Sequence, residues 1–438
     1  MIRAGKLVSG GQSLWAWLTA PRQLRVTCAT WTWLAVAAGL LLRLLSYADN
    51  RPLYRDERSL LANLARLPVF DFRTTLTEHQ LAPPGFLVVE RLMVRLGLPI
   101  VPAARLFPLA CGMAAMVLVP GVARRYLSRC AVPIAVGLFA LADWLVYYST
   151  ELKQYSCDLA LTLIALLLAA GPARAATPGP ASWSTRRLMA LAGFGAVGVW
   201  FSFPLTLVLA GIGTYLMTVS AIRGEWRRAL GLVAMGLVWV SSFAVCYVVS
   251  HGILSKERFI WDWWDFAFLR LPPRSLAELT TDFWQVVNVF DSPADVRTPL
   301  GVLPSAILAL GLFLCGCAAL GRRWPGGLYL LVAPMLLAML ASALRQYPFH
   351  GRLLIFLVPS IHLLVGEGAA TLTRRGRPWL TLALGAFLLL QPAGEAIWYR
   401  LMQAQQHVGY DSHGDLRADL LDYLEDLERK ARRSSSSP

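Results

Sequence analysis

The sequence predicts an all-α polytopic membrane protein. It has 438 residues, of which 56% are hydrophobic and only 15% are charged, and its mean hydropathy is +0.53. Soluble domains carry more charge than this, and apolar stretches long enough to cross a bilayer recur along most of the chain. Helices satisfy their backbone hydrogen bonds internally, as hydrocarbon requires. We therefore predict about eleven transmembrane helices and an external juxtamembrane helical loop.

The apolar stretches divide the chain into spans and connections. A segment of residues 1–27 comes first, a transmembrane domain follows at 28–400, and 401–438 is predicted to form an external amphipathic helix with a disordered tail. Long external loops are predicted at 48–101 and 251–300. The predicted spans are 28–47, 102–123, 131–149, 156–172, 188–203, 204–222, 229–250, 301–321, 327–344, 352–368 and 379–398.

Segment 83–97 decides the topology. It is short and contains Glu90, Arg91 and Arg95, so we interpret it as an interfacial or re-entrant helix. If it does not cross, the arginine clusters between later spans all lie on the side of the N-terminus, which the positive-inside rule assigns to the cytoplasm. The net charge of +15 then belongs to cytoplasmic loops and lipid headgroups, and indicates no nucleic-acid partner. We expect a multi-pass protein of the bacterial plasma membrane with its site facing outward.

Asp56 and Glu57 are the first candidates for chemistry. They follow the first predicted span in Tyr54-Arg55-Asp56-Glu57. Carboxylates are costly in hydrocarbon and cheap in water, so the pair marks either a solvated loop or a site at the membrane surface. Neighbouring side chains on a helix point about 100° apart, so we expect only one of the two to face a cavity. Asp56 is predicted to be a general base or metal-anchoring acid, and the alternative for Glu57 is a salt bridge to an arginine.

A divalent metal ion is a second possibility in the external loops. Glu78 and His79 could bind one together with a carboxylate from elsewhere, and His251 opens the second long loop as a further candidate ligand. Two ligands in one loop are not a metal motif. The alternative is a polar elbow before Pro83 and Pro84, which start the next helix.

A polar cluster interrupts the membrane segments near residue 151. Glu151, Lys153, Tyr155 and Asp158 lie at the outer end of the fourth predicted span. Asp158 and Tyr155 are three residues apart, so they can share a helix face. An acid just inside an apolar stretch usually faces a cavity or a partner. A lysine at a cavity mouth can bind phosphate, so we predict substrate binding by Glu151, Lys153 and Tyr155 and a catalytic role for Asp158.

A short turn between two late spans contains several cations. Arg345, Tyr347, His350 and Arg352 surround a proline there, and two arginines with a histidine could clamp a phosphate or pyrophosphate. The alternative is that these side chains only reach to the lipid headgroups. The tryptophan-rich loop 251–300 also has two interpretations, an aromatic belt or an amphipathic lid over a lipid-linked substrate.

Several short motifs, in this order, resemble the GT-C membrane glycosyltransferases, in the branch of the aminoarabinose lipid A transferase and the protein O-mannosyltransferases. The motifs are Tyr54-Arg55-Asp56-Glu57, Pro83-Pro84-Gly85-Phe86, Tyr147-Tyr148-Ser149-Thr150-Glu151-Leu152-Lys153-Gln154-Tyr155 and Tyr347-Pro348-Phe349-His350-Gly351-Arg352. The resemblance covers most of 28–400. The chain departs from it by reading Lys153-Gln154 where many relatives have Arg-Pro, and by lacking the large soluble C-terminal domain of some relatives.

The resemblance implies a function. Such proteins take a sugar from a polyprenyl-phosphate donor, with an essential acid in the first external loop, here Asp56. A second acid would be Asp158 or Glu151, and a metal, where present, would map onto Glu78 and His251. The acceptor, whether lipid, glycan or protein, stays open, and membrane lipids are the other expected partners.

Two other classes fit the composition. A transporter or flippase would place charges in the middle of the membrane, with broken helices in related pairs. An O-antigen polymerase or ligase would depend on arginines in large external loops. Substitution of Asp56 distinguishes these classes from the glycosyltransferase.

Overall fold

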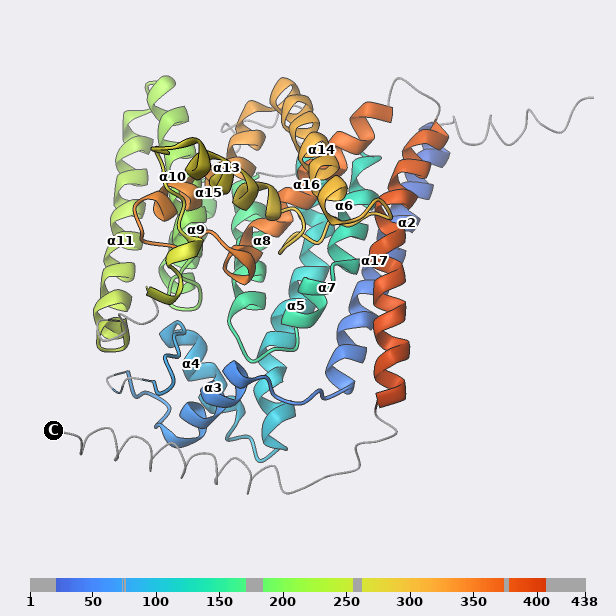
Figure 1. The fold of residues 1–438 in the computed structure, drawn as a ribbon. Coiled ribbons are helices and arrows are strands. Elements are labelled where there is room, and N and C mark those ends of the chain that lie inside the picture. Colours follow the sequence, from blue (N-terminus) through green and yellow to red (C-terminus); the bar gives the residue numbers. More distant parts are fainter. Residues whose placement is uncertain are drawn as a thin grey trace, which may run out of the picture.

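A computed structural model describes residues 21–72, 74, 76–170, 184–254, 262–373 and 378–406. All regular elements in these ranges are helices, so the predicted all-α fold is confirmed. The long helices run roughly parallel in one bundle, and two short helices lie across one of its ends (Figure 1). The long helices are α2 Pro21–Ala48, α5 Ile100–Tyr126, α8 Tyr155–Ala169, α9 Thr185–Gly198, α10 Leu205–Ile222, α11 Trp226–Leu254, α14 Val302–Arg323, α15 Pro325–Ala343, α16 Val358–Thr373 and α17 Pro378–Gln406.

The bundle is that of a multi-pass integral membrane protein. Eight helices in the described ranges are long and apolar enough to cross a membrane, and Ala131–Leu141 and Tyr155–Ala169 are shorter apolar helices. The predicted span 188–203 corresponds to α9, which has 14 residues and is not among these ten. Beyond Gln406, the predicted amphipathic helix and tail lie outside the described residues.

The predicted span 131–149 is broken in the structure. It consists of α6 Ala131–Leu141 and α7 Asp143–Tyr148, separated at Ala142, whose ψ of 113° leaves the helical region. The polar groups that the break frees are bound from outside. The Asp143 amide donates to Asp295 Oδ2 at 2.6 Å, and buried Arg43 of α2 donates to the Ala140 carbonyl at 3.5 Å. Because free backbone groups are costly in a membrane, these two contacts keep the break tolerable.

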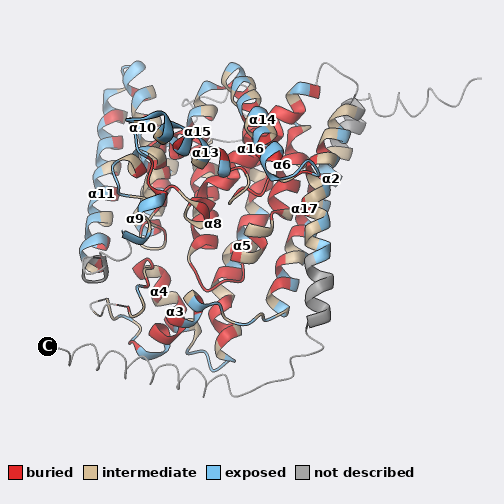
Figure 2. Ribbon diagram, in the orientation of Figure 1, coloured by how far each residue is buried: buried red, intermediate tan, exposed pale blue. Residues whose placement is uncertain are grey.

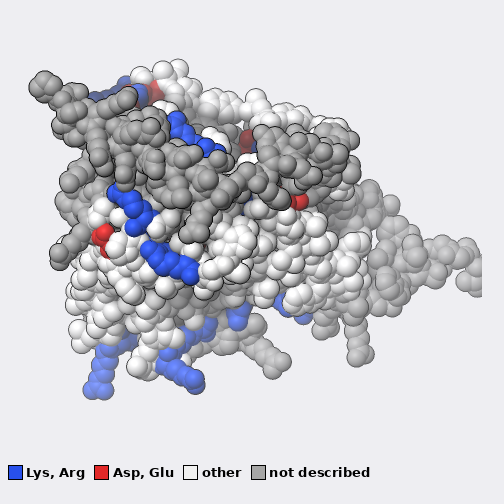
Figure 3. Space-filling model, turned by 90° about the horizontal axis from the view of Figure 1, so that it is seen from below, with Lys and Arg blue, Asp and Glu red and all other residues white. Residues whose placement is uncertain are grey.

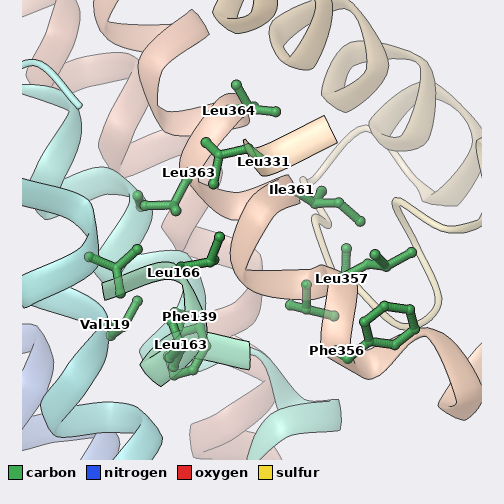
Figure 4. Packing of buried hydrophobic residues seen from close by; sticks show 14 of the residues in the cluster. Val119, Phe139, Leu163, Leu166, Leu331, Phe356, Leu357, Ile361, Leu363 and Leu364 are labelled. Carbon is green, nitrogen blue, oxygen red and sulfur yellow. The ribbon is translucent and has the colours of Figure 1, made fainter. Parts of the chain in front are cut away.

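The core lies where α5, α6, α8 and α16 meet. Figure 4 shows side chains of this cluster, among them Val119, Phe139, Leu163 and Ile361. Helix α16 is buried along nearly its whole length, whereas α11 and α17 expose much of their surface (Figure 2). Helices α14 and α16 touch backbone to backbone. An added methyl group on Gly368 would lie 1.8 Å from the Leu312 carbonyl oxygen, so only glycine fits there.

The first loop forms a small second layer across one end of the bundle. It contains α3 Arg55–Arg66 and α4 Pro84–Met93, which bury their own apolar cluster. Helix α4 is ten residues long, is not a candidate span and packs on α5, as expected for an interfacial helix. Its buried Arg91 donates to the carbonyls of Val69 and Asp71, which fixes the preceding chain. The arginines at the ends of α5 and α14 lie at the opposite end of the bundle (Figure 1).

Candidate active site

Helix α3 contains the acidic pair and is amphipathic, with one apolar face and one polar face. It begins after Tyr54, whose backbone is extended, and it has Asp56 and Glu57 in its first turn, where negative charge is favourable. Its apolar side chains pack beneath it against α4, and its outer face exposes Arg55, Arg58 and Arg66. Figure 3, viewed from this end, shows Lys and Arg side chains at several places and few acidic ones. The exposed arginines of α3 favour anionic ligands at its outer face.

Glu57 is fully buried in an ion-pair network. Its carboxylate accepts hydrogen bonds from Arg105 Nε at 3.2 Å and Nη2 at 3.1 Å, and from Arg51 Nη1 at 2.8 Å. The backbone amides of Tyr54 and Leu152 also donate to it, at 3.1 and 3.0 Å. Both oxygens are thus occupied by donors. Glu57 joins the first loop to α5 and to the turn before α8, so the salt-bridge alternative is confirmed and a direct catalytic role is not supported.

Asp56 pairs with Arg352 at a partly exposed position. Its Oδ2 accepts a hydrogen bond from Arg352 Nη2 at 2.8 Å, and the two side chains are 29% and 27% exposed. The residues are 296 positions apart in the chain. The Arg352 guanidinium also lies over the Tyr155 ring, 5.9 Å from its centre. Asp56 and Arg352 are therefore held together by tertiary structure at a place that solvent and ligands can reach.

The turn 149–154 brings a second cation to this place. Lys153 is buried, and its Nζ donates to Gln80 Oε1 at 2.6 Å. Burial lowers the pKa of Lys153 to about 8, and the Arg352 charge adds to this effect while Asp56 opposes it. Neighbouring Glu151 is also buried, which raises its pKa to about 7, with the Glu57 charge acting in the same direction. These electrostatic neighbours place Lys153, Glu151, Asp56 and Arg352 in one cluster.

Asp158 and Tyr155 lie behind this cluster on α8. Tyr155 packs edge-on against Tyr148, with ring centres 5.0 Å apart, and reaches Arg352 through its ring face. Asp158 is only 4% exposed, and its Oδ1 has no hydrogen-bond partner among the described residues. Tyr155 is therefore part of the site surface, whereas Asp158 sits one turn deeper inside the bundle.

The predicted phosphate clamp of the late turn is only partly assembled. Arg345 pairs with Asp265, and the His350 ring packs on Phe266 with ring centres 5.2 Å apart. Both side chains thus engage the segment before α13 and not Asp56. Tyr347 is partly buried and donates to the Leu353 carbonyl at 2.6 Å. The backbone turns sharply between these residues, with φ of 56° at Arg345 and 48° at Gly351, so Arg352 alone of the four is observed on Asp56.

The predicted metal ligands do not form a set. Glu78 and His79 have successive left-handed φ values of 58° and 54°, and Glu78 Oε2 lies 3.9 Å from Arg55 Nη2. The described residues include no group of three or more His, Cys, Asp or Glu side chains that could hold a metal ion. The side chain of His251 lies outside the described part of the chain. The described residues thus form no metal site, and the divalent metal ion stays a prediction.

Sequence reasoning missed three residues of the site region, Arg51, Gln80 and Arg105. Arg51 and Arg105 neutralise Glu57, and Gln80 holds Lys153. Arg105 had a detectable signal, because it is a charged residue within the predicted span 102–123, where charges are rare and usually paired. Gln80 and Arg51 had none, since polar residues in a loop are ordinary.

Comparisons with known proteins find similarity at the level of solved structures. No protein-family model matches the sequence, and no curated protein matches it. The structure is similar to ArnT from Cupriavidus metallidurans bound to undecaprenyl phosphate, with a TM-score of 0.47 and 20% identity over 81% of this chain and 63% of that one. It is also similar to the archaeal oligosaccharyltransferase AglB from Archaeoglobus fulgidus in complex with an inhibitory peptide and a dolichol-phosphate, with a TM-score of 0.45 and 12% identity over 87% of this chain. The chain spans 63% and 56% of the length of these two proteins.

Proposed function

We propose that this protein is a GT-C-type glycosyltransferase that moves a sugar from a polyprenyl-phosphate donor to an acceptor hydroxyl. The observation that carries the proposal is the divergence of Asp56 and Glu57. Both carboxylate oxygens of Glu57 accept hydrogen bonds from buried donors. The Asp56 carboxylate instead pairs with Arg352, where both side chains are partly exposed and Lys153 is an electrostatic neighbour. One accessible carboxylate with two cations, at one end of a membrane bundle, suits transfer from a lipid phosphate.

The roles of the three groups follow from the charges that the reaction moves. The acceptor oxygen forms a bond to the anomeric carbon and gives its proton to the Asp56 carboxylate. The bond between the anomeric carbon and the phosphate oxygen breaks, and the lipid phosphate leaves with the negative charge. Arg352 and Lys153 stabilise that charge. Direct attack from the face opposite the phosphate inverts the anomeric carbon.

The resting ion pair also has a role in this proposal. Arg352 Nη2 donates to Asp56 Oδ2 at 2.8 Å. An incoming phosphate competes for the guanidinium, which is the group best suited to bind it in two places. The guanidinium then binds the donor phosphate and interacts less with Asp56. The Asp56 carboxylate is therefore a stronger base when the donor is bound.

An apolar groove beside helix α4 suits the lipid chain of the donor. It has a volume of about 310 Å³ and lies between the loop after α3, helix α4 and the end of α9. Its lining is almost entirely apolar and consists of Phe70, Phe72, Gly85, Val88, Val89, Ala196, Val197, Trp200 and Phe201. Gly85 in this lining follows Gln80, the partner of Lys153, by five residues in the chain.

The membrane orientation belongs to the same proposal. Arginines gather at the end of the bundle opposite α3 and α4, which the positive-inside rule assigns to the cytoplasm. The site would then face the outer side of a bacterial plasma membrane, where a lipid-linked sugar meets acceptors of the cell envelope.

The transporter alternative has one feature in its favour. Arg43 is buried within a candidate span, and α6 breaks from α7 at Ala142. The groups freed by the break are bound by Arg43 and Asp295. A break closed in this way supports a structural adaptation and not a substrate site.

The test is transfer by the intact chain. Membranes with and without the protein are incubated with a panel of radiolabelled polyprenyl-phosphate sugars, and release of the labelled sugar from the lipid is measured. We expect release from one donor class, its loss in Asp56→Asn, and full activity in the control Asp262→Asn, which removes an exposed carboxylate far along the chain. Release that is equal in wild type and Asp56→Asn would refute the proposed base.

A further inference from the structure

Helix α13, Leu276–Asn288, buries polar side chains and exposes several large apolar ones. Its two buried residues are Val287, at 2% exposure, and the acid Asp282, at 6%, and Gln285 also faces inward. Its exposed side chains include Leu276, Leu279 and Phe283, which recur at helical spacing and so form one stripe with Trp284. A helix on a water-facing surface would show the opposite arrangement.

The inward polar groups of α13 bind backbone and not other helices. The Asp282 carboxylate accepts from the Arg270 amide at 3.2 and 3.0 Å. The Gln285 side-chain amide donates to the carbonyls of Ala267 and Phe349, at 2.7 and 2.9 Å. The Phe349 amide in turn donates to Ala267 at 2.8 Å. Gln285 therefore clamps two segments together, and one of them is the turn that leads, three residues later, to Arg352.

The outward stripe continues into lipid-facing surface. The start of α14 exposes Val302, Leu303 and Ile307 within a candidate membrane span. Figure 1 shows α13 at the height of α10, α14 and α15, and far from the end where α3 and α4 lie. Figure 2 shows most of α13 exposed. This helix lies within the predicted external loop 251–300, and it contacts α14, a candidate membrane span.

We propose that α13 is seated in the lipid bilayer with its apolar stripe against acyl chains, and that this seat holds the turn carrying Arg352. The occupant is lipid because the stripe carries no charged side chain and because α13 contacts α14, whose start exposes apolar side chains within a candidate membrane span. Exposed Arg270 and Arg274 precede the helix, where cations can reach lipid phosphates. The inward side of the element includes Asp282 and Gln285, whose side chains bind backbone groups of the neighbouring irregular segments, as is required for such backbone at membrane depth.

The test measures what surrounds the stripe. Leu279→Cys and Phe283→Cys are made in a background without the seven native cysteines, spin-labelled and placed in lipid nanodiscs. Collision rates with oxygen, which concentrates in lipid, and with a water-soluble nickel complex are compared. Leu237→Cys on α11 is the lipid-exposed control, and Ala65→Cys on the outer face of α3 is the control outside the spans.

We expect the oxygen-to-nickel ratio at both α13 positions to match Leu237→Cys and to exceed Ala65→Cys several-fold. A ratio equal to that of Ala65→Cys overturns the proposal. Low access for both reagents with dipolar broadening between labels also overturns it, because a second copy would then cover the stripe. If the cysteine-free chain does not fold, the wild-type chain is photolabelled with a lipid that carries a diazirine in its acyl chain. Absence of label on 276–288, with label present on α11, would then contradict a lipid seat.

A separate measurement tests whether Gln285 of α13 holds the turn 345–352. Gln285→Glu, which keeps the size of the side chain but loses its amide donor, should increase hydrogen exchange of the 345–352 backbone several-fold, while Gln346→Glu, an exposed control in the same turn, should not. Unchanged exchange in Gln285→Glu would mean that α13 does not hold this turn.

Discussion

Asp56 and Glu57 are chemically similar neighbours, yet the structure places them in opposite environments. Glu57 is fully buried and receives hydrogen bonds from two arginines and two backbone amides. Asp56 is about one-third exposed and has one observed partner, Arg352. A buried charge with complete hydrogen bonding supports the fold and has no capacity left for a substrate. A partly exposed charge whose observed partner is also partly exposed can exchange that partner for a ligand. The comparison therefore assigns chemistry to one residue and architecture to the next.

The largest expected effect is on catalysis at Asp56. Asp56→Asn should reduce sugar transfer about 10²–10⁴-fold, because an amide cannot accept the acceptor proton. The fold should be unaffected, since the side chain is partly exposed. Transfer rate and protein abundance in membranes are the two measurements. Transfer within a few-fold of wild type would show that another group is the base.

The next largest effect is on stability at Glu57. Glu57→Gln leaves the buried Arg105 without its counter-charge, which should cost about 3–5 kcal/mol of unfolding free energy. Unfolding by titration with a denaturing detergent in mixed micelles measures this, with Asp56→Asn as the matched control. If Glu57→Gln is as stable as the control but inactive, the roles of the two acids are reversed.

A smaller effect is expected on donor binding at Arg352. Arg352→Ala removes a charge-assisted hydrogen bond to the leaving phosphate, worth about 1.5–3 kcal/mol, or on the order of tenfold or more in donor affinity. Arg345→Ala is the control, because that arginine pairs with Asp265 instead. Competition by a short-chain polyprenyl phosphate reports the affinity. Equal losses in both variants would indicate that the whole turn binds phosphate.

The smallest effect is a pH dependence from Lys153. Burial lowers its pKa to about 8 from an ordinary value of 10.5, so the folded protein loses this proton on passing pH 8 while an unfolded chain keeps it. Donor affinity should therefore fall as pH rises through about 8. The protonated lysine also costs stability below that pH, and this cost disappears between about 8 and 10.5.

Lys153→Arg provides the control for this prediction. A guanidinium keeps its charge throughout the range, so its donor affinity should stay level where that of the wild type declines. A decline of the same size in both proteins would assign the titration to another group, of which Glu151 is the neighbouring candidate.

The orientation of the two acids could be predicted from the sequence, but their partners could not. The amphipathic pattern of α3 and the divergence of adjacent acids follow from helix geometry, so the separation of Asp56 from Glu57 could be expected. The identity of their partners could not, because Arg352 and Arg105 lie 296 and 48 residues away. Pattern reasoning grouped Arg345, His350 and Arg352 as one clamp, and the positive φ at Arg345 and Gly351 divides them.

The sequence by itself determined that this is an all-helical multi-pass membrane protein, because hydropathy and the need to satisfy backbone groups in lipid are local properties. It also determined which acids and cations were candidates for chemistry. Only the tertiary structure decided which candidate pairs with which, that α6 breaks where Arg43 and Asp295 can bind the free groups, and that α13 turns its polar side inward. These outcomes depend on the packing of segments remote in the chain, and no local pattern encodes the partner that a buried charge will find.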